Sequence, residues 1–206
     1  SNQDSVGLVE DLYVVADGMG GHRGGEVASA EAVAAMLAVF DRRDRAGLVA
    51  AVRSANRTIL EMTVTRPDLS GMGTTLCALA VANSASGDEV LAVANIGDSR
   101  VYRLAAGELV QVSDDHSLVA DLMRAGELTA EEAARHPQRN ILTRALGIEA
   151  DPVIDSWELE PALGDRYLLC SDGLFNELDD ARLAEVLAAG SVQEAADRLV
   201  GEAVEN

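Results

Sequence analysis

Residues 14–25 read VVADGMGGHRGG, and this stretch decides how the rest of the chain is interpreted. The apolar run over residues 12–16 predicts a buried strand, and it stops on one acid, Asp17. Five glycines follow within the next eight residues. A strand end holds a carboxylate in a fixed geometry, and a glycine beside it leaves the backbone carbonyl open to a ligand. The stretch therefore predicts a ligand-binding loop at the end of a strand.

Three more acids occupy polar turns next to apolar runs. They are Asp4, Asp98 and Asp172, and three of the four acids directly follow a predicted strand. Mg²⁺ and Mn²⁺ prefer carboxylate, carbonyl and water oxygens, which these positions supply. A single Asp-Gly pair usually marks only a turn. The four acids are too far apart in sequence for one loop, so a shared site requires that folding brings them together.

Composition narrows the class of protein. The chain has 206 residues, 48% of them hydrophobic, which favours a single domain over residues 1–206. Acids outnumber bases by 35 to 16, and the resulting charge of −19 argues against nucleic-acid partners and anionic membrane surfaces. The ordinary explanation of this charge is solubility, and the other is a cation site. No apolar run reaches the roughly 18 residues of a membrane span.

Cys77 and Cys170 both lie inside apolar runs. Two buried, free thiols are typical of a reducing compartment, so we expect a cytoplasmic protein. Strands and helices occur in blocks, which favours the α+β class. The patterns predict helices over 25–40 and 45–64, an antiparallel meander over 73–82, 89–96, 100–104 and 109–113, a polar lid over 117–147, strands over 153–159 and 166–170, and two closing helices.

Two capping boxes mark helix starts in this pattern. They are Thr129 with Glu132 and Ser191 with Glu194. The polar stretch and the acid motifs then fall into a fixed order along the chain. In sequence order the motifs read NQDS, VADGMGGHRGGEVAS, GMGTTL, NIGDSRVYRL, SDDHSLV, HPQRNILTRALG and GDRYLLCSDGL.

These ordered motifs resemble those of the bacterial PP2C-type, metal-dependent protein serine/threonine phosphatases, the PPM family. The resemblance runs from residue 1 to about residue 178. It implies a four-layer α-β-β-α sandwich of two antiparallel sheets flanked by helices. It also implies two core Mn²⁺ or Mg²⁺ ions, with a possible third, in a cleft at one end of the sheets.

The resemblance assigns metal roles to particular residues. Asp17 is expected to bridge the two core ions, the carbonyl of Gly18 to hold the second, and Asp172 to reach the first. Asp98 and Asp172 correspond to the third site, and Asp4 to an acid that binds metal-held water. Hydroxide between the two ions would then attack the phosphorus of phosphoserine or phosphothreonine, with no cysteine or serine nucleophile.

His22 is the candidate acid for the leaving alkoxide, which completes a catalytic set with Asp17 and Asp172. The alternative for His22 is a loop histidine bonded to backbone. His116 and His136 are interpreted as structural.

Residues 117–147 correspond to the flap of the family. Its arginines are candidates to steer a phosphopeptide, and the alternative is a solvated helical hairpin with ordinary salt bridges. The expected partners are phosphorylated serine/threonine proteins, kinases among them, and the expected state is a monomer without a membrane segment. The flap arginines are Arg124, Arg135, Arg139 and Arg144.

Two family features have no counterpart in this sequence. Family members usually carry an opening strand with a phosphate-binding arginine and a final strand with Asp-Asn, so either these lie outside the sequence or the metal site is damaged. Two alternatives follow. One is a phosphatase of a stress-regulatory partner-switching module, which the long flap argues against. The other is an inactive phosphoprotein-binding module of the same fold. The intact Asp17, Asp98 and Asp172 argue against it, and the missing final Asp argues for it.

Overall fold

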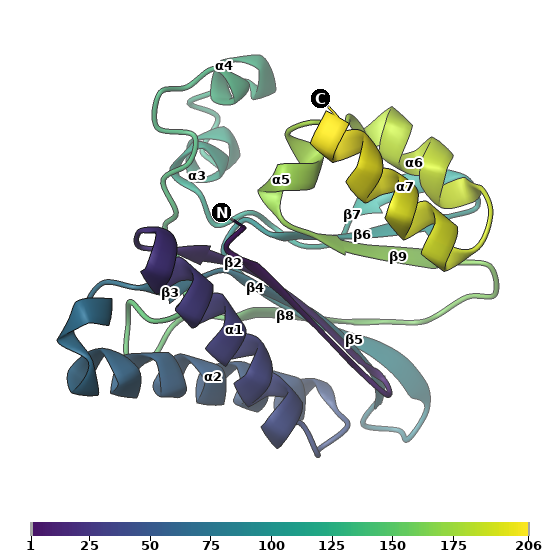
Figure 1. Ribbon diagram of the computed structural model, residues 1–206. Helices are drawn as coiled ribbons and strands as arrows, with labels where there is room; N and C mark the ends of the chain where they lie inside the picture. The colour runs from purple at the N-terminus through teal and green to yellow at the C-terminus, as the bar shows by residue number, and fades with distance from the viewer. Residues whose placement is uncertain (1, 206) are drawn as a thin grey trace.

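The computed structural model describes residues 2–205, apart from the side chain of His22. Its strands form two antiparallel sheets that lie face to face (Figure 1). The larger sheet has the order β1-β2-β4-β5-β8, with β3 paired to β2, and the smaller has the order β7-β6-β9. The strands are β1 (Asp4–Val9), β2 (Leu12–Met19), β3 (Gly73–Thr74), β4 (Leu76–Asn83), β5 (Glu89–Ile96), β6 (Arg100–Ala105), β7 (Glu108–Gln111), β8 (Asp155–Leu159) and β9 (Arg166–Cys170).

Helices cover the outer face of each sheet, as Figure 1 shows. Helices α1 (His22–Val39) and α2 (Arg45–Thr65) pack on the larger sheet. Helices α6 (Asp180–Ala188) and α7 (Val192–Glu205) cover the smaller one, with the short α5 (Asp172–Phe175) beside them. The predicted α-β-β-α sandwich of the α+β class is therefore confirmed.

The alternation of side chains along β2 builds both sides of the core. Leu12, Val14 and Ala16 are buried against the helices α1 and α2. Val15 packs instead with the residues between the two sheets. Successive side chains of a strand point to opposite faces, so Asp17 shares the face of Val15. The side chain of Asp17 is thereby directed into the layer between the sheets, at the end of the strand.

The helices begin and pack for local reasons. The Asp44 side chain caps α2 by accepting a hydrogen bond from the backbone N–H of Gly47 at 2.6 Å. Helix α1 lies close against β1 because residue 7 is a glycine. A Cβ on Gly7 would lie 2.5 Å from Cγ1 of Val33. The predicted capping boxes at Thr129 and Ser191 are both present.

The predicted meander over residues 73–113 is wrong in one respect. Strands β4 and β5 pair with each other, and β6 pairs with β7, but β5 and β6 belong to different sheets. The chain crosses between the sheets at Gly97, whose φ is +102°. A Cβ at Gly97 would lie 2.6 Å from the side chain of Thr75, so this crossing requires glycine. Runs that are apolar on both faces look alike whichever sheet they join, which explains the error.

One strand, one α-helix and the short 3-10 helix over Pro67–Leu69 were not predicted. The sequence did not predict strand β1 because this strand begins in a polar cluster. Its residues Val6 and Leu8 are exposed in the structure. The helix α5 is only four residues long. The predicted lid holds two short helices, α3 (Leu118–Arg124) and α4 (Ala130–Ala134), as expected. Each helix within residues 2–205 falls short of the length or apolar character that crossing a bilayer demands.

Candidate metal centre

The four predicted acids gather at one end of the two sheets. Asp4 and Asp17 are direct partners in the β1–β2 register. Asp172 opens α5 immediately after β9. Its neighbour Ser171 donates a hydrogen bond from Oγ to Oδ2 of Asp4 at 2.8 Å, across 167 positions of sequence. Asp98 lies in the crossing between the sheets, where the charge of Asp172 raises its pKa and its own charge raises the pKa of Asp17. Folding therefore brings the four acids together.

The electrostatics of this cluster are unfavourable without a cation. Burial, together with the charges of Asp4 and Asp172, raises the pKa of Asp17 to about 8. Burial and, to a lesser extent, the charge of Asp172 likewise raise the pKa of Asp98 to about 6. Within residues 2–205, none of the four carboxylates belongs to an ion pair. A hard divalent cation is the partner that such oxygen donors fit.

The side chains are not arranged as a closed coordination shell. In the described part of the chain, no three Asp, Glu, His or Cys side chains converge on one ion position. Two of the acids are held by hydrogen bonds instead, from Ser171 to Asp4 at 2.8 Å and from Asn176 to Asp172 at 3.3 Å. The donor set therefore fits divalent ions in its chemistry, and ligation requires rotation of the carboxylates toward one another.

The backbone at Asp17 is fixed by the strand beside it. The carbonyl of Asp17 accepts hydrogen bonds from Oγ1 of Thr74 at 2.8 Å and from the N–H of Thr75 at 2.9 Å. The N–H of Asp17 donates to Oγ1 of Thr75, which in turn contacts Oγ of Ser99 at 2.7 Å. Ser99 follows Asp98 directly, so one polar chain joins the two acid-bearing segments.

The glycines of the opening motif have a steric role that the sequence did not reveal. A Cβ on Gly18 would lie 2.0 Å from the carbonyl oxygen of Gly25. The end of β2 therefore packs backbone to backbone on the first turn of α1. Any larger residue at position 18 would push the helix away from the strand that carries Asp17. Close approach, besides access to a ligand, accounts for glycine at these two positions.

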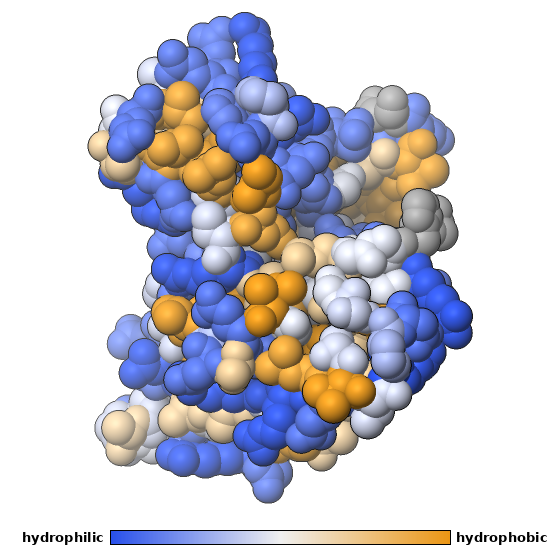
Figure 2. All heavy atoms as spheres, turned by 90° about the vertical axis from the view of Figure 1, so that its left-hand side faces the viewer, coloured by the Kyte–Doolittle hydropathy of each residue, from blue (hydrophilic) through white to orange (hydrophobic). Residues whose placement is uncertain are grey.

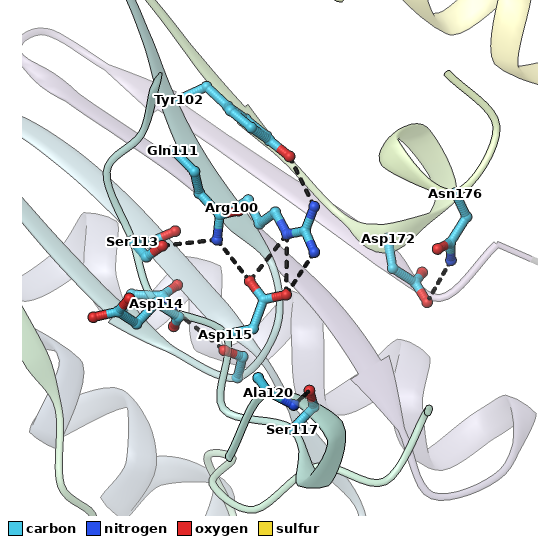
Figure 3. A network of polar contacts seen from close by, with 12 residues as sticks. Arg100, Tyr102, Gln111, Ser113, Asp114, Asp115, Ser117, Ala120, Asp172 and Asn176 are labelled. Atoms are coloured by element: carbon cyan, nitrogen blue, oxygen red, sulfur yellow. Dashed lines mark hydrogen bonds and ion pairs between the residues drawn. The ribbon is translucent and has the colours of Figure 1, made fainter. Parts of the chain in front are cut away.

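A second network, absent from the sequence-based predictions, surrounds Arg100 (Figure 3). Its guanidinium donates to both carboxylate oxygens of Asp115, from Nε to Oδ1 at 3.0 Å and from Nη2 to Oδ2 at 2.6 Å. Nη1 donates to the hydroxyl of Tyr102 at 2.9 Å, and Gln111 donates to Asp115. The only sequence signal was the place of Arg100, two residues after Asp98.

His116 holds two segments of the chain together, which agrees with the structural role expected from the sequence. Its ring is 1% exposed, and its Nδ1 accepts a hydrogen bond from the N–H of Gly97 at 3.1 Å. Since Nδ1 accepts, the proton of the neutral ring resides on Nε2, which donates to Oδ2 of Asp155 at 2.9 Å. Burial lowers the pKa of His116. The residue joins the start of the flap to the turn that carries Asp98.

The other two histidines contribute differently. His136 lies in the flap, where its Nδ1 accepts from the N–H of Gln138 at 3.2 Å. His22 is the first residue of α1, but its side chain lies outside the described part of the structure. Its role as an acid therefore stays a prediction.

Three of the four flap arginines form ion pairs. Arg124 pairs with Asp121, Arg135 with Glu131 at 3.3 Å, and Arg144 with Asp155 at 3.0 Å. These contacts match the alternative of ordinary salt bridges. Among residues 2–205, the side chain of Arg139 forms no ion pair and no hydrogen bond. Its charge is therefore free to contact a substrate. The four residues do not act as one basic patch.

The cysteines are buried and free, as predicted. Burial raises the pKa of the Cys170 thiol to about 12 and that of the Cys77 thiol as well. Because the thiolate is the nucleophilic form, neither residue is suited to attack phosphorus near neutral pH.

A family model described as protein phosphatase 2C matches residues 1–201. The chain belongs to the protein phosphatase 2C family. The four acids therefore lie in a chain with the phosphatase 2C fold. The resemblance predicted from the ordered motifs is confirmed.

Three similar proteins illustrate the relationship. The serine/threonine protein phosphatase PstP of Mycobacterium tuberculosis is 43% identical over 205 residues, covering 97% of this chain and 38% of that protein. The serine/threonine phosphatase stp of Listeria innocua is 38% identical, covering 90% of this chain and 77% of that protein. The catalytic domain of PstP, solved with two manganese ions, is 41% identical with a TM-score of 0.85, and the match covers all of this chain and 86% of that one. This phosphatase 2C chain spans about two fifths of the length of the first relative.

Proposed function

We propose that this protein phosphatase 2C family member is a metal-dependent phosphatase of phosphoserine and phosphothreonine in proteins. The observation that carries the proposal is the cluster of four carboxylates at one end of the two sheets, one with a pKa raised to about 8 and none in an ion pair within residues 2–205. The names of the relatives, serine/threonine protein phosphatases, support the substrate class. The manganese in a related catalytic domain supports the choice of Mn²⁺ or Mg²⁺.

The residues have separate tasks in this proposal. Asp17, the carbonyl of Gly18 and Asp172 hold two core ions, Asp98 shares a third site with Asp172, and Asp4 holds metal-bound water. A bound pair of divalent ions supplies hydroxide near neutral pH and neutralises charge on the phosphoryl oxygens. The strand end and the Thr74–Thr75 hydrogen bonds keep Asp17 in place, which limits the reorganisation that the reaction requires.

The finer expectations from the sequence are part of the same proposal. They are a single phosphatase domain over residues 1–206, a monomeric and cytoplasmic protein, kinases among its phosphoprotein substrates, and His22 as the acid for the leaving group. Two free, buried cysteines support a reducing environment.

Phosphate release tests the proposal directly. The purified chain is mixed with p-nitrophenyl phosphate or a phosphothreonine peptide, in EDTA and then with excess Mn²⁺ or Mg²⁺. We expect turnover that requires metal, and loss of turnover in Asp17→Asn but not in the exposed control Asp197→Asn. Turnover in EDTA would contradict the metal mechanism. Phosphopeptide binding without any turnover would instead favour the alternative, an inactive phosphoprotein-binding module.

A further inference from the structure

A hollow of about 360 Å³ lies at the base of the flap, outside the carboxylate cluster. Its apolar lining comes from the end of β2 and from the segment that returns from the flap to β8. Figure 2, which faces this side, shows hydrophobic side chains running from the flap onto the body, with hydrophilic atoms around them. The apolar lining residues are Met19, Leu142, Ala145, Ile148, Pro152 and Val153.

The hollow adjoins the acid cluster through β2. Met19 lies two residues after Asp17 in the same strand, so both side chains occupy the same face, about 7 Å apart along the strand. The segment that forms the opposite wall of the hollow is also bonded close to Asp17, through Thr74. The N–H of Thr74 donates to the carbonyl of Leu146 at 3.1 Å, and the N–H of Leu146 donates back to Thr74 at 2.9 Å. Thr74 also holds the carbonyl of Asp17.

The hollow is also lined by Thr143, Arg144 and Glu149, and two of its apolar residues are widely exposed to solvent. Ile148 is 52% exposed and Val153 is 60% exposed, in a chain with a net charge of −19. A flexible thioether, Met19, forms part of the wall and can adapt to the shape of an occupant.

The distance between the acid cluster and the hollow matches the spacing of side chains along a bound peptide. Side chains on one side of an extended peptide repeat about every 7 Å, the same interval that separates Asp17 from Met19. A peptide whose phosphorylated residue lies over the acid cluster therefore places a residue two positions away over the hollow. We propose that the hollow is a subsite for a large aliphatic side chain, such as leucine or methionine, within two residues of the phosphorylated residue of the substrate. The inference rests on the proposed phosphatase function.

The experiment compares two phosphothreonine peptides that differ only near the phosphorylated residue, one with leucine at the positions two before and two after it and one with serine. With Mn²⁺ present, we expect the protein to favour the leucine peptide by roughly tenfold in kcat/KM, mainly through KM, which is the order expected for partial burial of an aliphatic side chain. Val153→Ser and Ile148→Ser should each reduce this preference to about twofold or less. Both should leave p-nitrophenyl phosphate kinetics unchanged, since that substrate reaches only the acid cluster.

A matched control and a second readout keep the inference separable from the proposed function. Val110→Ser removes a valine of similar exposure, 50%, from β7 in the other sheet, and it should retain the full preference. Binding of fluorescent peptides with a non-hydrolysable difluoromethylphosphonate is measured in parallel by anisotropy. Equal kcat/KM and equal binding of the two peptides by the unaltered protein would overturn the subsite, as would equal losses on both peptides in folded Val153→Ser and Ile148→Ser.

Absence of any phosphate release would refute the proposed phosphatase activity, and the binding measurements would then decide the subsite alone. A preference for the leucine phosphonate that Val153→Ser removes and Val110→Ser keeps would support it. Binding without preference would overturn it.

Discussion

The guanidinium of Arg100 lies 3.7 Å from the centroid of the Phe175 ring. Phe175 ends the helix α5, and Asp172 begins that helix. The same guanidinium donates two hydrogen bonds to Asp115, which lies just before the flap. Arg100 also follows Asp98 by two residues. One side chain thus connects the two acid-bearing turns and the entrance to the flap. A cation–π contact of this kind contributes about 0.5–2 kcal/mol, depending on its exposure.

Arg100→Lys should weaken the metal centre without unfolding the protein. Lysine keeps the charge but cannot hold Asp115 with two parallel hydrogen bonds or stack flat on Phe175. We expect the Mn²⁺ concentration for half-maximal activity to rise by roughly tenfold, with a small decrease in Tm. Arg103→Lys is the matched control, because Arg103 lies on the same strand and pairs with Asp165 at 2.6 Å, away from the acids. An equal rise in both variants would contradict a positioning role for Arg100.

Asp17→Asn should separate catalysis from stability. With metal, we expect kcat to fall by about 10³-fold or more, because a neutral amide replaces the central carboxylate. In EDTA, however, the variant should melt at a higher temperature than the unaltered protein. The reason is that burial and the charges of Asp4 and Asp172 raise the pKa of Asp17 from 3.8 to about 8. Near neutral pH the unfolded chain carries this group ionised while the metal-free fold must protonate it, which lowers the free energy of unfolding. Calorimetric melting with and without Mn²⁺ measures both effects, and a lower Tm in EDTA would refute the electrostatic argument.

Asp98→Ala tests the third metal site against a purely structural turn. We expect isothermal titration to show two tightly bound metal ions with reduced turnover. Since burial raises the pKa of Asp98 to about 6, its removal should not lower the Tm of the metal-free protein. If Asp98 only capped the turn, Ala would cost about 1 kcal/mol of stability and leave kcat near normal. Asp88→Ala removes a carboxylate from an exposed turn, away from the acid cluster, and serves as the control.

His116→Asn should change how stability depends on pH. The folded pKa of His116 lies below its unfolded value, mainly through burial, with Arg144 and Arg124 opposing protonation and Asp155 favouring it. The unfolded chain therefore binds an extra proton as the pH falls below about 6.5, and the stability that the neutral ring provides above that pH is lost. Asparagine retains an acceptor for the N–H of Gly97 without titrating. The free energy of unfolding of both proteins is measured from pH 7.5 to pH 5.5. The value for the unaltered protein minus the value for His116→Asn should decrease as the pH falls.

Thiol reagents should leave activity intact while the protein is folded. Cys77 and Cys170 are buried, and burial raises the pKa of both. We expect iodoacetamide at neutral pH to modify neither residue in the native state, and both in urea, as mass spectrometry can show. Rapid inactivation of the folded protein with labelling of either cysteine would contradict the assignment.

Several features of the fold and of the site follow from local patterns of the sequence. The period of apolar residues was enough to predict α1 and α2. The apolar run before Asp17 was enough to predict where β2 begins, but not where it ends, because β2 continues past Asp17 to Met19. The capping boxes at Thr129 and Ser191 were predicted from residues three apart, because their hydrogen bonds close within one helical turn. The acids were identified as a set by their common position beside strands.

Only the tertiary structure decided which of these segments meet. Strands β5 and β6 read alike but enter different sheets, because the pairing partner of a strand depends on packing across the whole domain and not on its own alternation. The hydrogen bond from Ser171 to Asp4 spans 167 positions, and the contact of Arg100 with Phe175 joins β6 to α5. The sequence determined the chemistry available at each strand end. The packing of two sheets brought four carboxylates together at one end, three of them half-buried and Asp4 exposed, and this proximity raises the pKa of Asp17.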